Sequence, residues 1–143
     1  MTIQGILDRK GTDVVTIRAS STVEAAADEM RARSISALVV KAENLILGIV
    51  TDRDIVRAIS RHGAVALSLR VSDVLAQGMI TVTPTDGAKQ AMNLMTRYRV
   101  RHLPVLVDGE LAGIVSIGDV VKDWLDDLEL ESNVLRELYI AAR

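Results

Sequence analysis

The fold is decided by a short stretch, GIVTDRDIV, at residues 48–56. Its apolar start passes directly into a segment with helical spacing, and Thr51 and Asp54 stand three residues apart at the junction. A hydroxyl residue followed three positions later by an acidic one is typical of a capping box, in which both side chains bond free amides at a helix start. The same pair can also bind the hydroxyl groups of a ligand at the mouth of a cleft. This stretch alone leaves both interpretations open.

The pattern returns 65 residues later as GIVSIGDVV at residues 113–121. With this offset, residues 15–56 align with residues 80–121 without a gap. The alignment matches Thr16 with Thr81, Ala26 with Ala91, Met30 with Met95, Leu38 with Leu103 and Asp54 with Asp119. Ser116 keeps the hydroxyl group of Thr51. The chain therefore holds two copies of one unit, and an internal repeat of this kind determines the fold.

Each copy predicts the element order β-α-β-β-α. A short strand is expected at residues 14–17 and 79–83, and a helix follows at residues 23–33 and 88–98, where apolar side chains recur at helical spacing. Two apolar runs then predict a hairpin, which in the second copy has Asp108 and Gly109 at its turn. The last helix of each copy begins at Thr51 or Ser116. We place the repeats at residues 3–60 and 68–125, with residues 126–143 as a helical extension.

The predicted fold class is α/β, in the α+β sense, with two tandem β-α-β-β-α repeats. A unit of about 60 residues buries too little surface to be stable alone. The second and third strands of each copy are apolar nearly throughout, as expected for a sheet that is buried on both faces. We therefore expect the two copies to pack against each other about a pseudo-twofold axis, as one module.

The segment at residues 119–140 lies largely outside the repeat and predicts one long helix, or two helices broken near Ser132 and Asn133. It carries two apolar stripes, formed by Val121, Trp124, Leu125 and Leu128 and by Val134, Leu135, Leu138 and Tyr139. Such stripes either complete the core of the same chain or contact a partner, and both alternatives stay open.

The composition argues against several classes of partner. There are 17 basic and 19 acidic side chains, so no overall charge favours nucleic acid or an anionic membrane. The basic run RYRVRH at residues 97–102 could contact nucleic acid, but the chain holds only one Trp, two Tyr and no Phe, too few for a base-stacking platform. No apolar run is long enough to span a membrane, and the first residues lack the pattern of a secretory signal. We expect a cytoplasmic protein.

The residue inventory also argues against an enzyme. The chain has no cysteine, which excludes disulfides and thiolate catalysis, and two histidines are few for a metal site. Ser116 has no base near it in the sequence, and the GIVSIG segment matches neither a dinucleotide fingerprint nor a P-loop. We expect no catalytic residue, no metal and no catalytic cofactor.

Two copies of G-h-h-[ST]-x-x-D in register, where h is apolar, together with RHLPVL at residues 101–106, resemble the CBS-domain pair, named from cystathionine β-synthase. The resemblance covers about residues 3–125 and is to small bacterial proteins with no attached enzyme or channel domain. It implies a homodimeric regulatory module that binds AMP, ADP, ATP or NAD(H) in clefts between the repeats and signals to an unidentified protein by a conformational change. The alternative is a ligand-free dimerisation or scaffold module.

In this family the acidic residue of the motif binds the ribose hydroxyl groups, and the hydroxyl residue contacts ribose or phosphate. That chemistry suits an ionised carboxylate, which only accepts hydrogen bonds. The free amides of the following helix favour a phosphate. By this resemblance one cleft would combine Ser116 and Asp119 with Thr16, Ile17, Ser36, Ala37 and Leu38. The other would combine Thr51 and Asp54 with Thr81, Val82, Arg101, His102, Leu103 and Pro104.

The two copies differ at the predicted clefts. Arg101, His102 and Pro104 of the second copy replace Ser36, Ala37 and Val39 of the first, so the cleft with the second set carries one more positive charge. We predict that it is the better phosphate site. Gly118 also replaces Arg53, which predicts a different reach toward phosphate at the two helix starts. Whether one or both clefts bind stays open.

Overall fold

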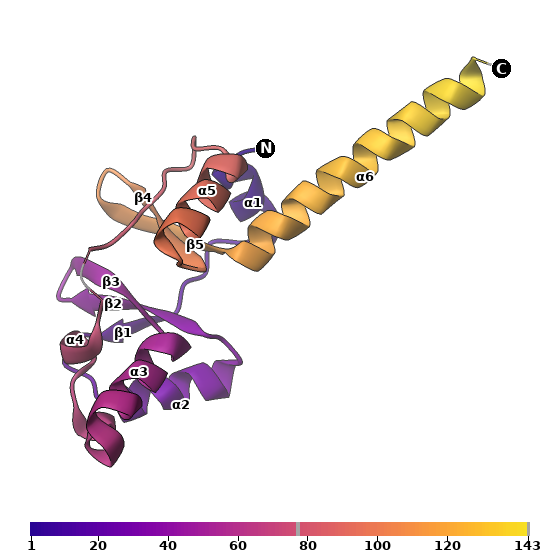
Figure 1. The fold of residues 1–143 in the computed structure, drawn as a ribbon. Helices are drawn as coiled ribbons and strands as arrows, with labels where there is room; N and C mark the ends of the chain where they lie inside the picture. The colour runs from indigo at the N-terminus through magenta and orange to yellow at the C-terminus, as the bar shows by residue number, and fades with distance from the viewer. Residues whose placement is uncertain (77, 143) are drawn as a thin grey trace. The chain divides into compact units, whose positions relative to one another are not determined.

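The computed structural model describes residues 1–76 and 78–142, and its helices and strands are labelled in Figure 1. The chain forms two compact units. Unit 1 consists of Met1–Thr12 and Thr81–Arg143, and unit 2 consists of Asp13–Ile80. Each unit contains the main part of one repeat, together with the first residues of the other repeat. The compact units therefore cross the predicted repeat boundaries at residues 3–60 and 68–125.

Unit 2 is a small sheet with helices packed against it. Its elements are β1 (Thr16–Arg18), α2 (Val23–Arg33), β2 (Ala37–Ala42), β3 (Leu45–Thr51), α3 (Asp52–His62), η1 (Gly63–Ser68) and α4 (Val71–Val74). The strand order is β1-β2-β3, with β1 parallel and β3 antiparallel to β2. In Figure 1, α2 and α3 lie on the same side of this sheet. Their apolar residues meet those of the strands in a core that includes Ala26, Met30, Leu38, Val50 and Ile55.

Unit 1 has the same arrangement, except that an isolated bridge takes the place of the first strand. Its elements are α1 (Ile3–Lys10), α5 (Ala88–Tyr98), β4 (His102–Val107), β5 (Glu110–Ser116) and α6 (Ile117–Ala141). Strands β4 and β5 form an antiparallel hairpin. Asp108 and Gly109 both have positive φ at its turn, of 51° and 80°, as two-residue hairpin loops require. The predicted helices at residues 23–33 and 88–98 and the predicted hairpin are confirmed.

The strand predicted at residues 79–83 is wrong: Val82 makes only an isolated parallel bridge to Val105. In unit 2 the equivalent pairing begins with the Val39 amide, which donates to the Val15 carbonyl at 3.0 Å. The residue that corresponds to Val39 is Pro104, which has no N–H to donate. Unit 1 therefore loses the first bond of this ladder and forms a bridge in place of a strand.

Equivalent backbone bonds attach each leading segment to its unit. In unit 1 the Ala88 amide at the start of α5 donates to the Met1 carbonyl at 3.1 Å. In unit 2 the Val23 amide at the start of α2 donates to the Leu69 carbonyl at 2.9 Å. The segment at the start of each repeat thus accepts a hydrogen bond from the first helical amide of the other repeat.

Gly113 in β5 makes room for the leading helix of unit 1. A Cβ at this position would lie 2.7 Å from Cδ2 of Leu7, a buried side chain of α1. We expect Gly113→Ala to lower the free energy of unfolding by about 1–3 kcal/mol, the usual cost of an added methyl group in a tight core. Chemical denaturation measures this change. Gly118→Ala is the control, because its Cβ would lie 3.7 Å from Ser116 Oγ, and an equal loss in both variants would contradict the steric account.

Candidate functional site

Both copies of the motif form complete capping boxes. At the start of α3 the Asp54 amide donates to Thr51 Oγ1 at 3.3 Å, and the Thr51 amide donates to Asp54 Oδ2 at 2.9 Å. At the start of α6 the Asp119 amide donates to Ser116 Oγ at 3.2 Å, and the Ser116 amide donates to Asp119 Oδ2 at 2.8 Å. The capping interpretation is therefore confirmed for both motifs. It leaves ligand binding untested, because each carboxylate has a second oxygen.

The hairpins bring other predicted site residues to these caps. In unit 2, Ala37 pairs with Thr51, and the Asp52 amide donates to the Ser36 carbonyl at 3.0 Å. In unit 1, His102 pairs with Ser116, and the Ile117 amide donates to the Arg101 carbonyl at 2.9 Å. Each cap is thus accompanied by the strand residues of its own repeat. The predicted combination of residues from both repeats in one cleft involves both units and stays a prediction.

Several predicted site residues have buried side chains. Ile17, Leu38, Val82, Leu103 and Pro104 are buried, so their side chains belong to the cores of their units. Burial limits the contact these side chains can make with a ligand, although Ile17 lines a pocket; Asp54 is also buried, with 8% exposure. The polar members of the predicted set that remain at least partly accessible are Thr16, Ser36, Thr51, Thr81, Arg101, His102, Ser116 and Asp119.

The two motif carboxylates have different neighbours. Asp54 is 8% exposed, its Oδ2 also accepts the Thr51 hydroxyl at 3.1 Å, and its Oδ1 meets Arg57 at 3.5 Å. Asp119 is more open, and its Oδ2 accepts a hydrogen bond from Lys10 Nζ at 2.6 Å. Lys10 lies in the last turn of α1 and also donates to the Ile114 carbonyl at 2.9 Å. The N-terminal helix thus brings a positive charge to one motif.

Hydrogen bonds from Lys10 and the Ser116 amide favour the ionised form of Asp119. Burial of this carboxyl acts to raise its pKa, but the hydrogen bond from Lys10, the bond from the Ser116 amide and the lysine charge outweigh burial and hold the pKa below its ordinary value. Because the pKa is lower in the folded chain than in the unfolded chain, this ion pair stabilises the fold above the ordinary carboxyl pKa. The contribution is lost as the pH falls through the folded pKa.

Lys10→Met is expected to raise the pKa of Asp119, because burial then acts without the lysine to oppose it. A pH titration of the Asp119 carboxyl ¹³C resonance measures this change, and the resonance of Asp86, whose Oδ2 accepts from the nearby Thr83 amide at 2.8 Å, serves as the control. If the pKa of Asp119 stays the same in the variant, Lys10 does not bind it in solution.

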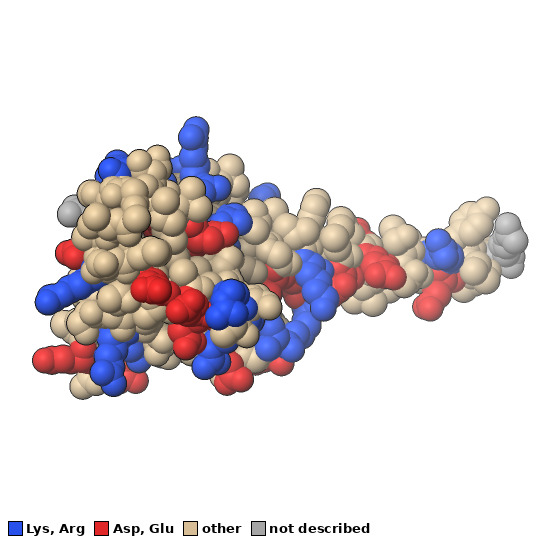
Figure 2. Space-filling model, turned by 90° about the horizontal axis from the view of Figure 1, so that it is seen from below, with Lys and Arg blue, Asp and Glu red and all other residues tan. Residues whose placement is uncertain are grey.

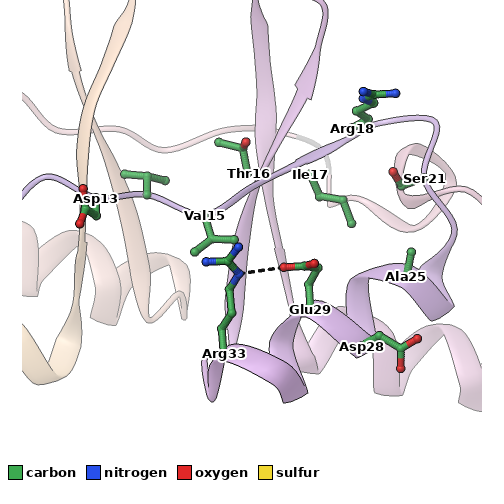
Figure 3. A pocket seen from close by; sticks show the side chains of 11 residues that line it. Asp13, Val15, Thr16, Ile17, Arg18, Ser21, Ala25, Asp28, Glu29 and Arg33 are labelled. Atoms are coloured by element: carbon green, nitrogen blue, oxygen red, sulfur yellow. Dashed lines mark hydrogen bonds and ion pairs between the residues drawn. The ribbon is translucent and has the colours of Figure 1, made fainter.

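An open pocket of about 850 Å³ lies along β1 and α2 of unit 2. It is lined by the predicted residues Thr16 and Ile17, and also by Arg18, Glu29 and Arg33, which sequence reasoning missed. Figure 3 shows the Ile17 side chain pointing toward α2 and those of Thr16 and Arg18 pointing away. Arg33 Nε bonds Glu29 Oε2 at 2.9 Å, an i,i+4 pair whose spacing was visible in the sequence. The pocket is therefore lined by both acidic and basic side chains.

The backbone of β1 is available at this pocket. Strand β1 is at an edge of the sheet, and it bonds β2 through the Val15 carbonyl and the Ala19 amide. Backbone groups alternate in direction along a strand, so the N–H and C=O groups of Thr16 face the open edge. Such a pair offers one donor and one acceptor side by side.

The residues that the structure describes include no group of three His, Cys, Asp or Glu side chains arranged to hold a metal ion. Within that same part of the chain, none of the helices combines the length and apolar character needed to cross a bilayer. The extra charge predicted around Arg101 and His102 lies in unit 1, beside the Ser116 cap.

Comparison with known proteins gives a consistent result. A CBS domain model matches residues 7–61 and 71–126. The CBS domain-containing protein CBSX3, mitochondrial, of Arabidopsis thaliana is 36% identical over 130 residues, which cover 85% of this chain and 63% of that protein. The crystal structure of the CBS-domain containing protein ATU1752 from Agrobacterium tumefaciens matches with a TM-score of 0.83 and 41% identity, over 86% of this chain and 98% of that chain.

A more distant match concerns a protein with bound ligands. The CBS domain pair of MJ0100, crystallised with 5′-methylthioadenosine and S-adenosyl-L-methionine, has a TM-score of 0.77. It is 19% identical to this chain, over 89% of this chain and 98% of that chain. At this identity the likeness shows a common fold.

Proposed function

The chain belongs to the CBS-domain family as a tandem pair, and on this premise we propose that it senses adenine nucleotides. Such pairs are regulatory modules rather than enzymes. The ligand would be AMP, ADP, ATP or NAD(H), and its binding would change the arrangement of the repeats for a protein partner to detect. A mechanism of this kind requires the ligand to bind two states unequally. The cytoplasmic location expected from the sequence stays a prediction.

The observation that carries this proposal is that the two oxygen atoms of each motif carboxylate have different hydrogen-bond partners. The capping bonds to Asp54 and to Asp119 both go to Oδ2, and Lys10 also bonds Oδ2 of Asp119. Among the described residues, Oδ1 of Asp54 has one weak contact at 3.5 Å with Arg57. One oxygen therefore holds the helix start, while the other keeps the capacity to accept a ribose hydroxyl. The cap fixes the carboxylate in place for this contact.

The pocket along β1 supports an adenine ligand. Adenine presents an amino donor beside a ring-nitrogen acceptor, and the outward N–H and C=O of Thr16 form the complementary pair. A volume of about 850 Å³ lies in the range of small-molecule sites. The MJ0100 pair was crystallised with two adenosine-containing ligands, which fits the same class of ligand here.

A panel of AMP, ADP, ATP, NADH and S-adenosylmethionine tests the proposal by thermal shift. A ligand that binds only the folded chain stabilises it by about 2.7 kcal/mol at one hundred times its Kd, which raises the unfolding temperature by several degrees. No shift with any of these ligands at millimolar concentration would contradict the proposal. It would favour the second candidate, a ligand-free dimerisation or scaffold module, for which the complete capping boxes already give both motifs a structural role.

We further propose that two copies of the chain associate through α6. The C-terminal part of this helix extends beyond the other elements of unit 1 (Figure 1), and every residue from 128 to 142 is exposed. The α6 stripe consists of Val121, Trp124, Leu125, Leu128, Leu135, Leu138 and Tyr139, which share one face at the spacing of a coiled coil. A helix without tertiary contacts has marginal stability in water, so this stripe needs another surface to pack against.

The charged residues beside the stripe indicate that the packing surface is a second copy of α6. Glu129 and Glu131 flank the stripe before Ser132, and Arg136 flanks it one turn after. In a parallel pair Arg136 would meet Glu131 of the other copy, and in an antiparallel pair it would meet Glu129. Figure 2 shows uncharged surface along α6, interrupted by small groups of acidic and basic side chains. The face is therefore self-complementary in apolar contact and in charge.

A further inference from the structure

The contact between Lys10 and Asp119 ties the N-terminal helix to a proposed ligand site. Lys10 Nζ lies 2.6 Å from Asp119 Oδ2 and 2.9 Å from the Ile114 carbonyl oxygen. The side chains of Lys10 and Asp119 are 30% and 23% exposed, so the pair sits at the surface of unit 1 within reach of a ligand. An ammonium group has three donors. Among the described residues two of these donors are used, by Asp119 and by the Ile114 carbonyl, which leaves the third for a ligand.

The other motif has no equivalent lysine. The segments that lead the two repeats occupy matching places, because Leu7 packs on Gly113 and Leu75 packs on Gly48, its counterpart in the first repeat. Three residues beyond Leu7 stands Lys10, whereas three residues beyond Leu75 stands Gly78. Asp54 instead has the 3.5 Å contact with Arg57 of its own helix. The two motifs therefore differ in a charged group that the internal sequence comparison did not align.

This difference is expected to change which adenosine ligands the Asp119 site binds most tightly. A ribose that binds Oδ1 of Asp119 would lie beside the Lys10 ammonium, because both oxygens belong to one carboxylate. A 5′-phosphate on that ribose would gain a charge-assisted hydrogen bond and the favourable dipole at the start of α6, a helix of 25 residues. Neutral adenosine gains neither, and the sulfonium group of S-adenosylmethionine is repelled by the lysine.

We propose that Lys10 makes the Asp119 site selective for phosphorylated adenosine ligands over adenosine and S-adenosylmethionine. The proposal rests on the proposed function, since it specifies the ligand of one of the two sites. Lys10 acts here as a ligand-binding residue that is supplied by α1 from 109 positions away in the chain.

Calorimetric titration of the full chain with AMP and with adenosine tests this selectivity. An Asp54→Glu background weakens the first site and leaves the second to be measured. Lys10→Met is expected to weaken AMP binding at least about tenfold, as for a lost hydrogen bond to a charged group, while adenosine binds equally or more tightly. Lys10→Arg should retain most of the preference for AMP. Lys89→Met, which removes an exposed lysine of α5 in the same unit, should change neither affinity.

The outcomes separate this proposal from the proposed function. If the unmodified chain binds none of AMP, ADP, ATP, NADH and adenosine, both proposals fail. If it binds AMP but Lys10→Met changes both ligands equally, or neither, the role of Lys10 is overturned while nucleotide sensing stands. A second measurement does not depend on the folding of a variant: AMP should shift the Lys10 side-chain NMR resonances of the unmodified chain more than adenosine does. Equal shifts with both ligands would also overturn the proposal.

Discussion

Replacing either motif aspartate by glutamate is expected to weaken nucleotide binding at that site at least about tenfold, with little effect on the fold. Glutamate is the usual third residue of a capping box, so its carboxylate can still reach the Thr51 or Ser116 amide. The extra methylene group moves the second oxygen away from the position that Oδ1 holds for the ribose. Calorimetric titration with AMP measures binding, and chemical denaturation measures the free energy of unfolding, which should change by less than about 1 kcal/mol.

Two further variants make this result specific. Asp54→Ala or Asp119→Ala removes the bond that the carboxylate accepts from the Thr51 or Ser116 amide as well as the ligand contact, and should lower the free energy of unfolding by about 0.5–1.5 kcal/mol. Asp73→Glu changes an aspartate that bonds the Arg70 amide at the start of α4 and lies outside both motifs, so nucleotide binding should survive it. Unchanged AMP binding in Asp54→Glu and in Asp119→Glu would mean that the two carboxylates serve only the helix caps.

The double variant Leu128→Lys/Leu135→Lys is expected to be a monomer in solution, with half the molar mass of the dimeric unmodified protein. Both side chains lie on the α6 stripe and are 43% and 60% exposed within one chain, so folding of the chain outside the C-terminal part of α6 should be unaffected. In an association through the stripe, each copy would bury two unpaired charges, at a cost far above that of losing apolar contact. Light scattering coupled to size-exclusion chromatography measures the mass. Helix content should also fall, since the end of α6 would fray without a partner.

Leu130→Lys is the matched control for this experiment. Leu130 is 64% exposed on the same helix, but it lies on the opposite face from the stripe. Its replacement adds a lysine without placing it in the proposed interface, and the mass should stay that of the unmodified chain. An unmodified chain that is a monomer, or a double variant with unreduced mass, would contradict association through α6.

Much of the local structure was predictable because its signals are local. Ala26 and Met30, and likewise Ala91 and Met95, recur at helical spacing, and α2 and α5 span the predicted residues. The choice between one and two C-terminal helices was open, because Ser132 and Asn133 are weak helix formers. The structure has one helix through both. The bridge at Val82 was mispredicted because the deciding residue is Pro104, which lies in another strand.

The long-range features of the site could not be predicted from one sequence. Thr51, Asp54, Ser116 and Asp119 were found by their spacing, but spacing does not say which carboxylate oxygen serves the cap. The bond from Lys10 to Asp119 joins residues 109 positions apart, and nothing near either residue signals it. It exists because the leading segment of one repeat packs in the unit that holds the other repeat.

The measurement that tests nucleotide sensing most directly is calorimetric titration of the unmodified chain with AMP, ATP and NADH. The account predicts saturable binding of at least one of these ligands, with a stoichiometry of one or two per chain. It also predicts that the double variant Asp54→Glu/Asp119→Glu folds normally and loses this binding. If none of the three ligands binds at millimolar concentration, or if the double variant binds as the unmodified chain does, the two carboxylates are not the ligand-binding groups of this protein.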